Sequence, residues 1–282
     1  MLDVLTLTDA GARTHEDIFT GRSVWMPAGR VFGGQVLAQS MIAACHTVPP
    51  ERVVHSLHGY FLRPGDTALP ISFAVDRIHD GRSFSARRVQ AYQRGVPILS
   101  MITSFQTQDE GFDHQLDMPA GLPRPEELSG DDASLARLTD PVTRHWAQGR
   151  AFEMRHVSSP VYLKVRGERV AHQCVWFKTR SPLPDDENLH RAALVYASDY
   201  SILESVFRRH GVSWSDRDAK IASLDHAMWW HRFGRVDRWL LYAQESPSAT
   251  GGRGFATGRI YTRDGILLAS VAQEGMIRVG GR

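Results

Sequence analysis

An internal repeat constrains the fold of this chain more than any other feature of its sequence. Five residues recur 171 positions later with the same or a similar side chain: Gly81/Gly252, Arg82/Arg253, Phe84/Phe255, Arg88/Arg259 and Val89/Ile260. Flanking pairs keep nearly the same offset, with Tyr92/Tyr261, Arg63/Arg232 and Gly65/Gly234 at 169 and Gly95/Gly265 at 170. So steady an offset indicates two copies of one structural unit.

Each copy reads as one helix followed by a series of strands. In the first copy a helix is expected from Gly33, and strand-like runs follow at residues 52–64, 70–80, 83–93 and 97–107. In the second copy a helix is expected over residues 197–211, with Asp199 near its start and Gly211 as its C-cap. Its strand-like runs cover residues 219–233, 237–246, 254–262 and 265–279.

This order predicts an α+β protein in which a helix is wrapped by a curved antiparallel sheet, the hotdog arrangement. Two tandem units side by side would form one continuous sheet, a double hotdog. We place the N-terminal repeat at residues 1–107 and the C-terminal repeat at residues 150–282. The segment between them, residues 108–149, is rich in Pro, Gly and acidic residues and is expected to be a linker or crossover, with a short helix around residues 133–148.

Composition excludes several classes of protein. The chain has 282 residues, of which 42% are hydrophobic, and a net charge of only +2, which argues against nucleic acid as a partner. No window approaches the roughly 18 apolar residues of a membrane span, and the N-terminus does not resemble a secretory signal. Two isolated cysteines, Cys45 and Cys174, fit a reducing cytoplasm and argue against a zinc site or a disulfide scaffold.

Familiar catalytic and cofactor motifs are missing from the sequence. It contains neither G-x-S-x-G nor H-E-x-x-H, the signatures of a nucleophile elbow and of a common zinc hydrolase. The glycine-rich segment 252–258 has the wrong spacing for a dinucleotide loop, and a strand rather than a helix follows it. His226 and His231, five apart on one run, are not expected to share a metal.

Three polar residues of the second repeat stand out. Asp199 is either a helix cap or a functional carboxylate, and Ser223 taken alone is an ordinary strand residue. Gln273 interrupts the apolar face of Leu267, Ala269 and Val271, where an apolar side chain would pack at lower cost. Gln273 is therefore the least easily explained by folding alone.

Several long segments resemble the acyl-CoA thioesterase II family, and together they cover nearly the whole chain. They include GRVFGGQVLAQ, VHSLHGYFLRPGD, DGRSFSARRVQAYQ, ASLDHAMWWHR, WLLYAQESPSA, GRGFATGRIYTRDG and LLASVAQEG. The resemblance implies a double-hotdog enzyme that hydrolyses medium- to long-chain fatty acyl-CoA to free acid and coenzyme A. In that family an aspartate, a Thr or Ser hydroxyl and a glutamine hold the attacking water, and these positions correspond to Asp199, Ser223 and Gln273.

The resemblance also sets the expected ligands and the alternatives. No metal, nucleotide or organic cofactor is expected, and acyl-CoA is the expected substrate. Backbone N–H groups at Gly33 and Gly34 could receive the oxyanion, while the arginines of the repeat motifs could meet phosphates or form solvated ion pairs. A hotdog hydratase or dehydratase and a non-catalytic acyl-CoA-binding module remain alternatives, although the D-x-N-x-x-H pattern of the former is missing.

Two further expectations concern the number of sites and of chains. At the repeat offsets, Asp199 falls opposite Gly34, Ser223 opposite Val54 and Gln273 opposite Ser104, so one active site per chain is expected. A homo-oligomer stays open, because a sheet edge or face can pair two chains and no residue decides it.

Overall fold

The computed structural model describes residues 1–9, 16–131, 135, 149–162 and 164–280. It divides into two compact units. The first comprises residues 1–114, 183–198 and 227–233, and the second comprises residues 115–182, 199–226 and 234–282. Nearly all of the short helix expected around residues 133–148 lies outside the described residues.

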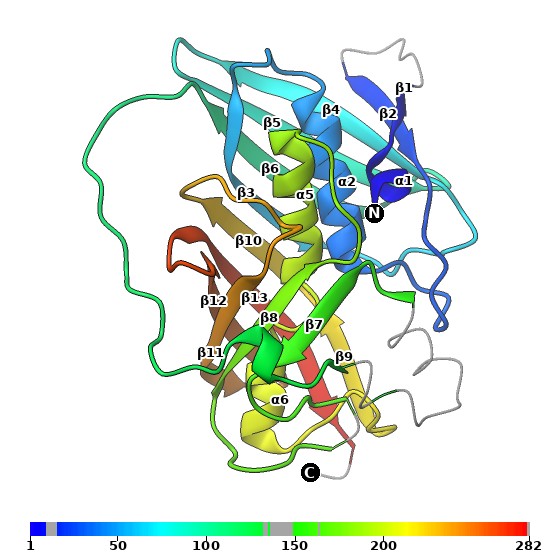
Figure 1. Ribbon diagram of the computed structural model, residues 1–282. Coiled ribbons are helices and arrows are strands. Elements are labelled where there is room, and N and C mark those ends of the chain that lie inside the picture. The colour runs from blue at the N-terminus through cyan, green and yellow to red at the C-terminus, as the bar shows by residue number, and fades with distance from the viewer. Residues whose placement is uncertain (10–15, 132–134, 136–148, 163, 281–282) are drawn as a thin grey trace. The chain divides into compact units, whose positions relative to one another are not determined.

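The first unit is an antiparallel sheet covered by helices. Its strands run in the order β1-β2-β4-β5-β6-β3. Their bounds are Thr8–Asp9 (β1), Asp17–Gly21 (β2), Val53–Phe61 (β3), Ile71–Asp80 (β4), Phe84–Gln93 (β5) and Val96–Gln106 (β6). Its helices are α1 (Leu2–Leu5), α2 (Gly33–Cys45) and α5 (Glu187–Ser198). α2 packs on the sheet and lies beside α5 (Figure 1).

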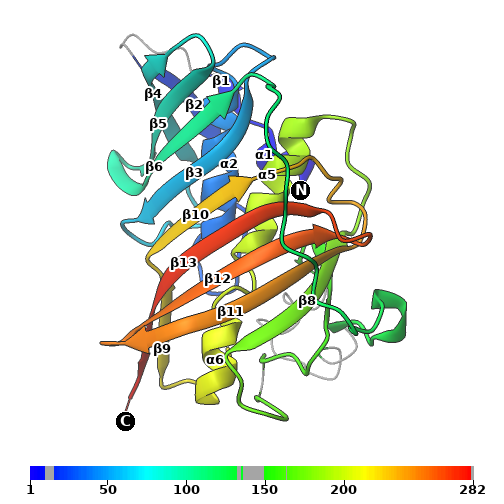
Figure 2. The same ribbon diagram turned by 90° about the vertical axis from the view of Figure 1, so that its left-hand side faces the viewer.

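The second unit repeats this architecture. Its strands run in the order β13-β12-β11-β8-β7, and β9 also pairs with β13. Their bounds are Phe152–His156 (β7), His172–Thr179 (β8), Ala219–Ser223 (β9), Leu240–Thr250 (β11), Arg253–Thr262 (β12) and Leu267–Val279 (β13). A short 3-10 helix, η1 (Pro125–Glu127), and the helix α6 (Glu204–His210) complete it. α6 packs against β8, β11 and β12, three strands that run side by side in Figure 2.

The repeat seen in the sequence is present in the strand registers. Ser72 of β4 pairs with Tyr92 of β5, and Leu241 of β11 pairs with Tyr261 of β12. Both members of the second pair lie 169 residues after their counterparts. The α+β class and the duplicated helix-and-sheet unit predicted from the sequence are therefore confirmed.

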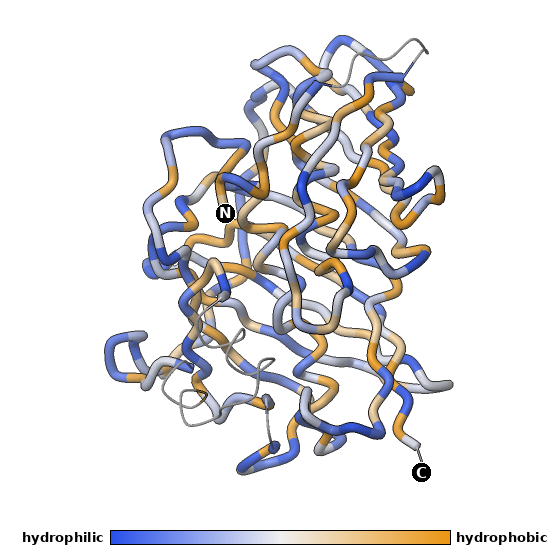
Figure 3. Tube along the Cα trace, turned by 90° about the vertical axis from the view of Figure 1, so that its right-hand side faces the viewer, coloured by the Kyte–Doolittle hydropathy of each residue, from blue (hydrophilic) through white to orange (hydrophobic). Residues whose placement is uncertain are grey.

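Buried and more exposed residues alternate along the strands, as expected for a sheet that packs one of its faces against the core. In β13, Ala269, Val271, Gln273 and Gly275 are buried, whereas the residues between them are only partly buried. Figure 3 shows apolar and polar residues interspersed along the Cα trace. One face of each sheet can thus pack against a helix.

The expected strand over residues 219–233 is two strands in the structure. β9 ends at Ser223, and β10 (Asp225–Trp230) begins after Leu224, with its first two residues in the second unit. The Leu224 N–H donates to the carbonyl of Glu274, and the Asp225 carboxylate accepts the Glu274 N–H at 2.7 Å. These bonds hold the interruption against β13, a tertiary contact that the strand pattern does not encode.

Candidate active site

Asp199 lies in a turn between two helices. α5 ends at Ser198 and α6 begins at Glu204, so the expectation that Asp199 opens a helix is wrong by one turn. The predicted end of the helix is correct, because Gly211 caps α6 with a left-handed φ of 69°. Within α6, Val206 and Phe207 are buried. Because Asp199 lies outside both helices, contacts with residues distant in the sequence can set the direction of its carboxylate.

The structure brings Asp199, Ser223 and Gln273 together. Asp199 Oδ1 accepts hydrogen bonds from Ser223 Oγ at 3.1 Å and from Gln273 Nε2 at 2.9 Å. Gln273 Nε2 also lies 2.9 Å from Ser223 Oγ. Each of the three side chains thus contacts the other two, although the residues are up to 74 positions apart in the sequence.

Neighbouring strands present two of these side chains. Ser223, the last residue of β9, pairs with Gly275 of β13, and Gln273 lies two residues earlier on the same strand. Gly275 leaves room for the Asp199 turn, because a Cβ at that position would lie 2.4 Å from Leu203 Cδ1. A larger residue at position 275 would therefore displace the Leu203 side chain of the turn.

Burial differs among the three side chains. Asp199 and Gln273 are 8% and 1% exposed, whereas Ser223 is only partly buried. An Asp199 carboxylate with so little contact with water is held by hydrogen bonds. Ser223 is thus the member of the group that is most open to a ligand.

His226 is a site residue that the sequence analysis missed. Its Nδ1 contacts Gln273 Oε1. Burial lowers the pKa of His226, against the opposing influence of the Asp199 charge and of the bond to Gln273. A neutral imidazole donates Nδ1–H to the Gln273 oxygen, and this bond turns the amide nitrogen towards Asp199 and Ser223.

The sequence suggests His226 only as a candidate metal ligand together with His231, and that interpretation does not predict its contact with Gln273. The available signal was its position directly after Asp225, on the strand-like run that carries Ser223. A buried histidine at that point can serve to orient a glutamine as readily as to bind a metal.

Tyr242 adds to the electrostatics around Asp199. The ring is 1% exposed and packs edge-on against Phe177. Burial raises the pKa of Tyr242, and the Asp199 charge raises it further. The phenol is therefore neutral at physiological pH and contributes no second negative charge near Asp199.

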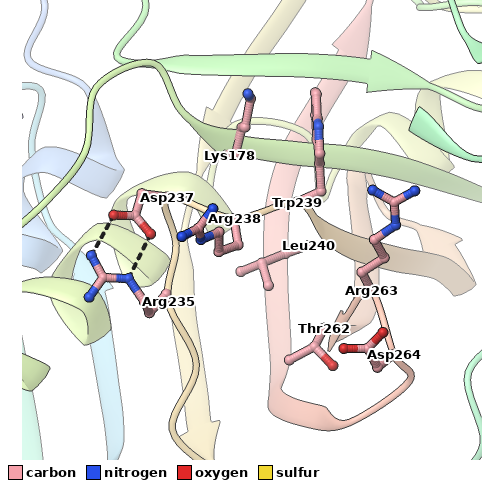
Figure 4. A pocket seen from close by; sticks show the side chains of 9 residues that line it. All are labelled: Lys178, Arg235, Asp237, Arg238, Trp239, Leu240, Thr262, Arg263 and Asp264. Atoms are coloured by element: carbon pink, nitrogen blue, oxygen red, sulfur yellow. Dashed lines mark hydrogen bonds and ion pairs between the residues drawn. The ribbon is translucent and has the colours of Figure 1, made fainter. Parts of the chain in front are cut away.

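A separate hollow of about 500 Å³ lies at the ends of β8, β11 and β12 (Figure 4). It is lined by Lys178, Arg235, Asp237, Arg238, Trp239, Leu240, Thr262, Arg263 and Asp264. Three of its cations are paired with acids, Arg235 with Asp237 at 2.6 Å, Arg263 with Glu126 at 2.8 Å and Lys178 with Glu153 at 3.5 Å. The three predicted site residues are not part of this lining, so the candidate site and the hollow are distinct.

Three arginines of the repeat motifs form surface ion pairs. Arg88 pairs with Asp76, Arg253 with Glu274 and Arg259 with Glu245, at 2.9–3.1 Å on the surface. Arg87 is 1% exposed and binds Asp80 and Thr47. These contacts match the expected solvated pairs for the first three and show that Arg87 is part of the core.

Comparisons with known proteins identify the family. The model of the acyl-CoA thioesterase family matches residues 147–276, and that of the acyl-CoA thioesterase N-terminal domain matches residues 22–106. Acyl-CoA thioesterase 2 of Haemophilus influenzae is 37% identical, with 93% of this chain and 92% of that protein covered. The chain belongs to the acyl-CoA thioesterase family. The family resemblance seen in the sequence is confirmed, and the protein is a thioester hydrolase.

Solved structures of similar proteins confirm the double hotdog. An acyl-CoA thioesterase II from Mycobacterium marinum is 40% identical and superposes with a TM-score of 0.80, covering 99% of this chain and 98% of that one. A protein from Alicyclobacillus acidocaldarius described as having a hot dog fold gives a TM-score of 0.77 over 98% of this chain and 97% of its own. At 18% identity the latter likeness concerns the fold alone.

Two kinds of site are not found among the residues that the structure describes. No helix among the described residues is long and apolar enough to cross a membrane. Within those residues, no group of three or more His, Cys, Asp or Glu side chains is arranged to hold a metal ion.

Proposed function

We propose that this thioester hydrolase acts on medium- to long-chain fatty acyl-CoA, and that Asp199, Ser223 and Gln273 hold and deprotonate the water that attacks the thioester. The observation that carries the proposal is the closed set of hydrogen bonds among these three side chains, with Asp199 Oδ1 at its centre. A carboxylate, a hydroxyl and an amide together can both accept from and donate to one water molecule.

The residue types suit the reaction. A thiol leaves readily as the thiolate, because its pKa is about 8.5, so a strong general acid is unnecessary. The reaction needs an oriented water and a base within hydrogen-bond reach of it. Asp199 is the base in this proposal, and it takes the proton either directly or through the Ser223 hydroxyl.

His226 has a supporting role in the proposal. Through Gln273 Oε1 it fixes which end of the amide faces the other two residues. Without that contact the amide could turn over and present oxygen to the Asp199 carboxylate, which would repel it. The attacking water would then lose the N–H donor of Gln273, and Ser223 would be its remaining uncharged hydrogen-bond partner.

Release of coenzyme A is the experiment that tests the proposal. We expect free thiol from acyl-CoA substrates in the range from octanoyl to palmitoyl, and we expect it to be lost in Asp199→Asn. No thiol release at any chain length would remove the proposal. Hydration of an enoyl-CoA without thiol release would favour a dehydratase-type activity, and tight binding without turnover would favour a silent binding module.

Three expectations from the sequence carry over as parts of the proposal. We place the protein in the cytoplasm, an assignment supported by two free cysteines, Cys45 and Cys174. We place the repeats at residues 1–107 and 150–282, with a crossover between them, and limited proteolysis tests these limits. Light scattering decides whether the chain forms the homo-oligomer that the sequence leaves open.

A further inference from the structure

A second group of buried polar side chains lies next to the Asp199 turn, within the second unit. His156 stands between two carboxylates, with Nδ1 2.8 Å from Asp131 Oδ2 and Nε2 2.7 Å from Glu204 Oε2. The three residues are 5%, 2% and 0% exposed. Charges so deeply buried persist only when they are paired and hydrogen-bonded.

Glu204 is the first residue of α6 and is held at both of its carboxylate oxygens. Trp214 Nε1 donates to Oε1 at 2.9 Å, and Gln173 Nε2 donates to Oε2 at 3.0 Å, beside His156. The Glu204 N–H donates to the carbonyl of Ser201 at 2.9 Å. The start of α6 is thus tied to the buried group by side chain and to the Asp199 turn by backbone.

Two glutamines extend this group to the turn. Gln173 of β8 and Gln244 of β11 are directly paired in the sheet, and Gln173 Nε2 lies 2.8 Å from Gln244 Oε1. Gln244 Nε2 then donates to Ser201 Oγ at 2.7 Å. Ser201 follows Asp199 by two residues and is 1% exposed.

We propose that Gln244 and Ser201 are positioning residues that hold the turn of residues 199–203, and with it the Asp199 carboxylate, against the buried Asp131–His156–Glu204 group. The turn links α5 to α6, and its Ser201 hydroxyl is bonded to Gln244 of β11 at 2.7 Å, so a side chain from the sheet holds the turn in place. On its other side the Asp199 carboxylate meets Ser223 and Gln273. This inference rests on the proposed role of Asp199 as the base.

The test compares two variants that remove the Ser201–Gln244 hydrogen bond with one that replaces a buried, hydrogen-bonded glutamine of the first unit. Ser201→Ala and Gln244→Leu each remove the Ser201–Gln244 hydrogen bond. We expect kcat to fall about 10- to 100-fold in both, because a misplaced base costs rate rather than substrate affinity. KM is expected to stay within about threefold, since substrate contacts are unchanged.

Gln93→Leu is the matched control. Gln93 is also a buried strand glutamine, in the first unit, and it is bonded to the Asp66 N–H at 2.7 Å and to the Asp66 and Leu69 carbonyls at 2.8 and 3.1 Å. We expect this variant to lower the melting temperature about as much as Gln244→Leu does, but to keep kcat within about twofold. An equal loss of kcat in the control would overturn the positioning role.

Combining variants separates this inference from the proposed function. In an Asp199→Asn background, Ser201→Ala should lower kcat no further, because the residue that it positions no longer acts as a base. If Asp199→Asn is impaired while Ser201→Ala and Gln244→Leu keep wild-type kcat, the positioning role is wrong and the proposed function stands. Wild-type turnover in Asp199→Asn itself would overturn both.

Discussion

The two units share a frame but differ at the positions that carry chemistry. Where the second unit has Gln273, facing Ala256 in the sheet, the first has Ser104, facing Ala86. Ser104 Oγ lies 2.9 Å from His55 Nε2 and is engaged by that contact. The same register thus supports a glutamine bonded to a carboxylate in one unit and a serine bonded to a histidine in the other.

The remaining counterparts in the first unit are apolar or lack a side chain. Val54, opposite Ser223 at the repeat offset, is fully buried. Gly34, opposite Asp199, lies in the first turn of α2, where a Cβ would come 2.5 Å from the Tyr196 carbonyl oxygen. A carboxylate cannot be accommodated there. Among the described residues, both units thus keep the duplicated architecture, whereas the proposed base and water-binding groups of the second unit have counterparts of other kinds in the first, so one frame can carry different side-chain chemistry.

Replacement of the proposed base is the change expected to have the largest effect. Asp199→Asn keeps size and hydrogen bonding but removes the negative charge, so we expect kcat to fall by about 10²–10⁴. Because Asn keeps the side-chain oxygen that accepts from Ser223 and Gln273, a purely structural role in the turn predicts near-normal turnover. Asp76→Asn in the first unit breaks only the surface ion pair with Arg88 and serves as the control, with kcat unchanged.

The glutamine and serine that correspond in the two units offer the next largest contrast. Gln273→Ala removes the hydrogen bonds to Asp199, Ser223 and His226 and should lower kcat about 10²-fold. Ser104→Ala removes the His55 contact and should leave kcat within about twofold. Steady-state kinetics of both variants checks the comparison, and equal losses would assign chemistry to both units.

A smaller effect is expected at Ser223. Ser223→Ala should lower kcat about 10-fold, because Asp199 and Gln273 keep their direct contact at 2.9 Å. Ser223→Thr should stay close to wild type, since the hydroxyl is retained. Equal turnover of the Ser, Thr and Ala forms would remove this residue from the mechanism.

The buried His156 of the second unit and the partly buried His55 of the first predict opposite responses of stability to pH. Two carboxylates raise the pKa of His156 to about 10 despite its burial. Its contribution to stability is therefore full below pH 6.5 and is lost as pH rises towards 10, by at most about 1.4 kcal/mol per pH unit. In the first unit, burial and the Arg191 charge lower the pKa of His55, so that contribution is present above pH 6.5 and is lost in acid.

Urea unfolding at several pH values measures these two windows. Burial raises the pKa of Cys45 to about 12 and that of Cys174 to about 11, from 9.0, so the thiols weaken stability only above about pH 9. A free energy of unfolding that declines between pH 6.5 and 9 would therefore report His156. A free energy of unfolding that stays constant over this range would contradict a His156 imidazolium that is paired with both Asp131 and Glu204.

The sequence predicted the repeated frame well because periodicity and turns are local signals. The runs at residues 70–80 and 83–93 correspond to β4 and β5 within one residue at each end. The Asp199 turn could not be predicted, because the bonds that interrupt the helix come from residues distant in sequence. One of them joins Ser201 to Gln244, 43 positions away.

The sequence predicts the three residues of the candidate site but not the buried polar group beside them. Gln273 stands out in the sequence because a glutamine on an apolar strand face is costly without partners, whereas Asp199 and Ser223 are singled out by the family resemblance. The buried group of Asp131, His156 and Glu204 has no comparable signal, since its members are 25 and 48 positions apart. No local pattern links residues at such separations.

We expect one active site per chain, and calorimetric titration counts the sites. The probe is an acyl-CoA analogue whose thioether linkage cannot be hydrolysed, titrated into the wild-type protein and into the Asp199→Asn, Gln273→Ala double variant. We expect one equivalent bound per chain in the wild type, and no residual turnover of the parent substrate in the double variant. Two equivalent sites per chain, or a double variant that keeps about half of the turnover, would contradict this expectation.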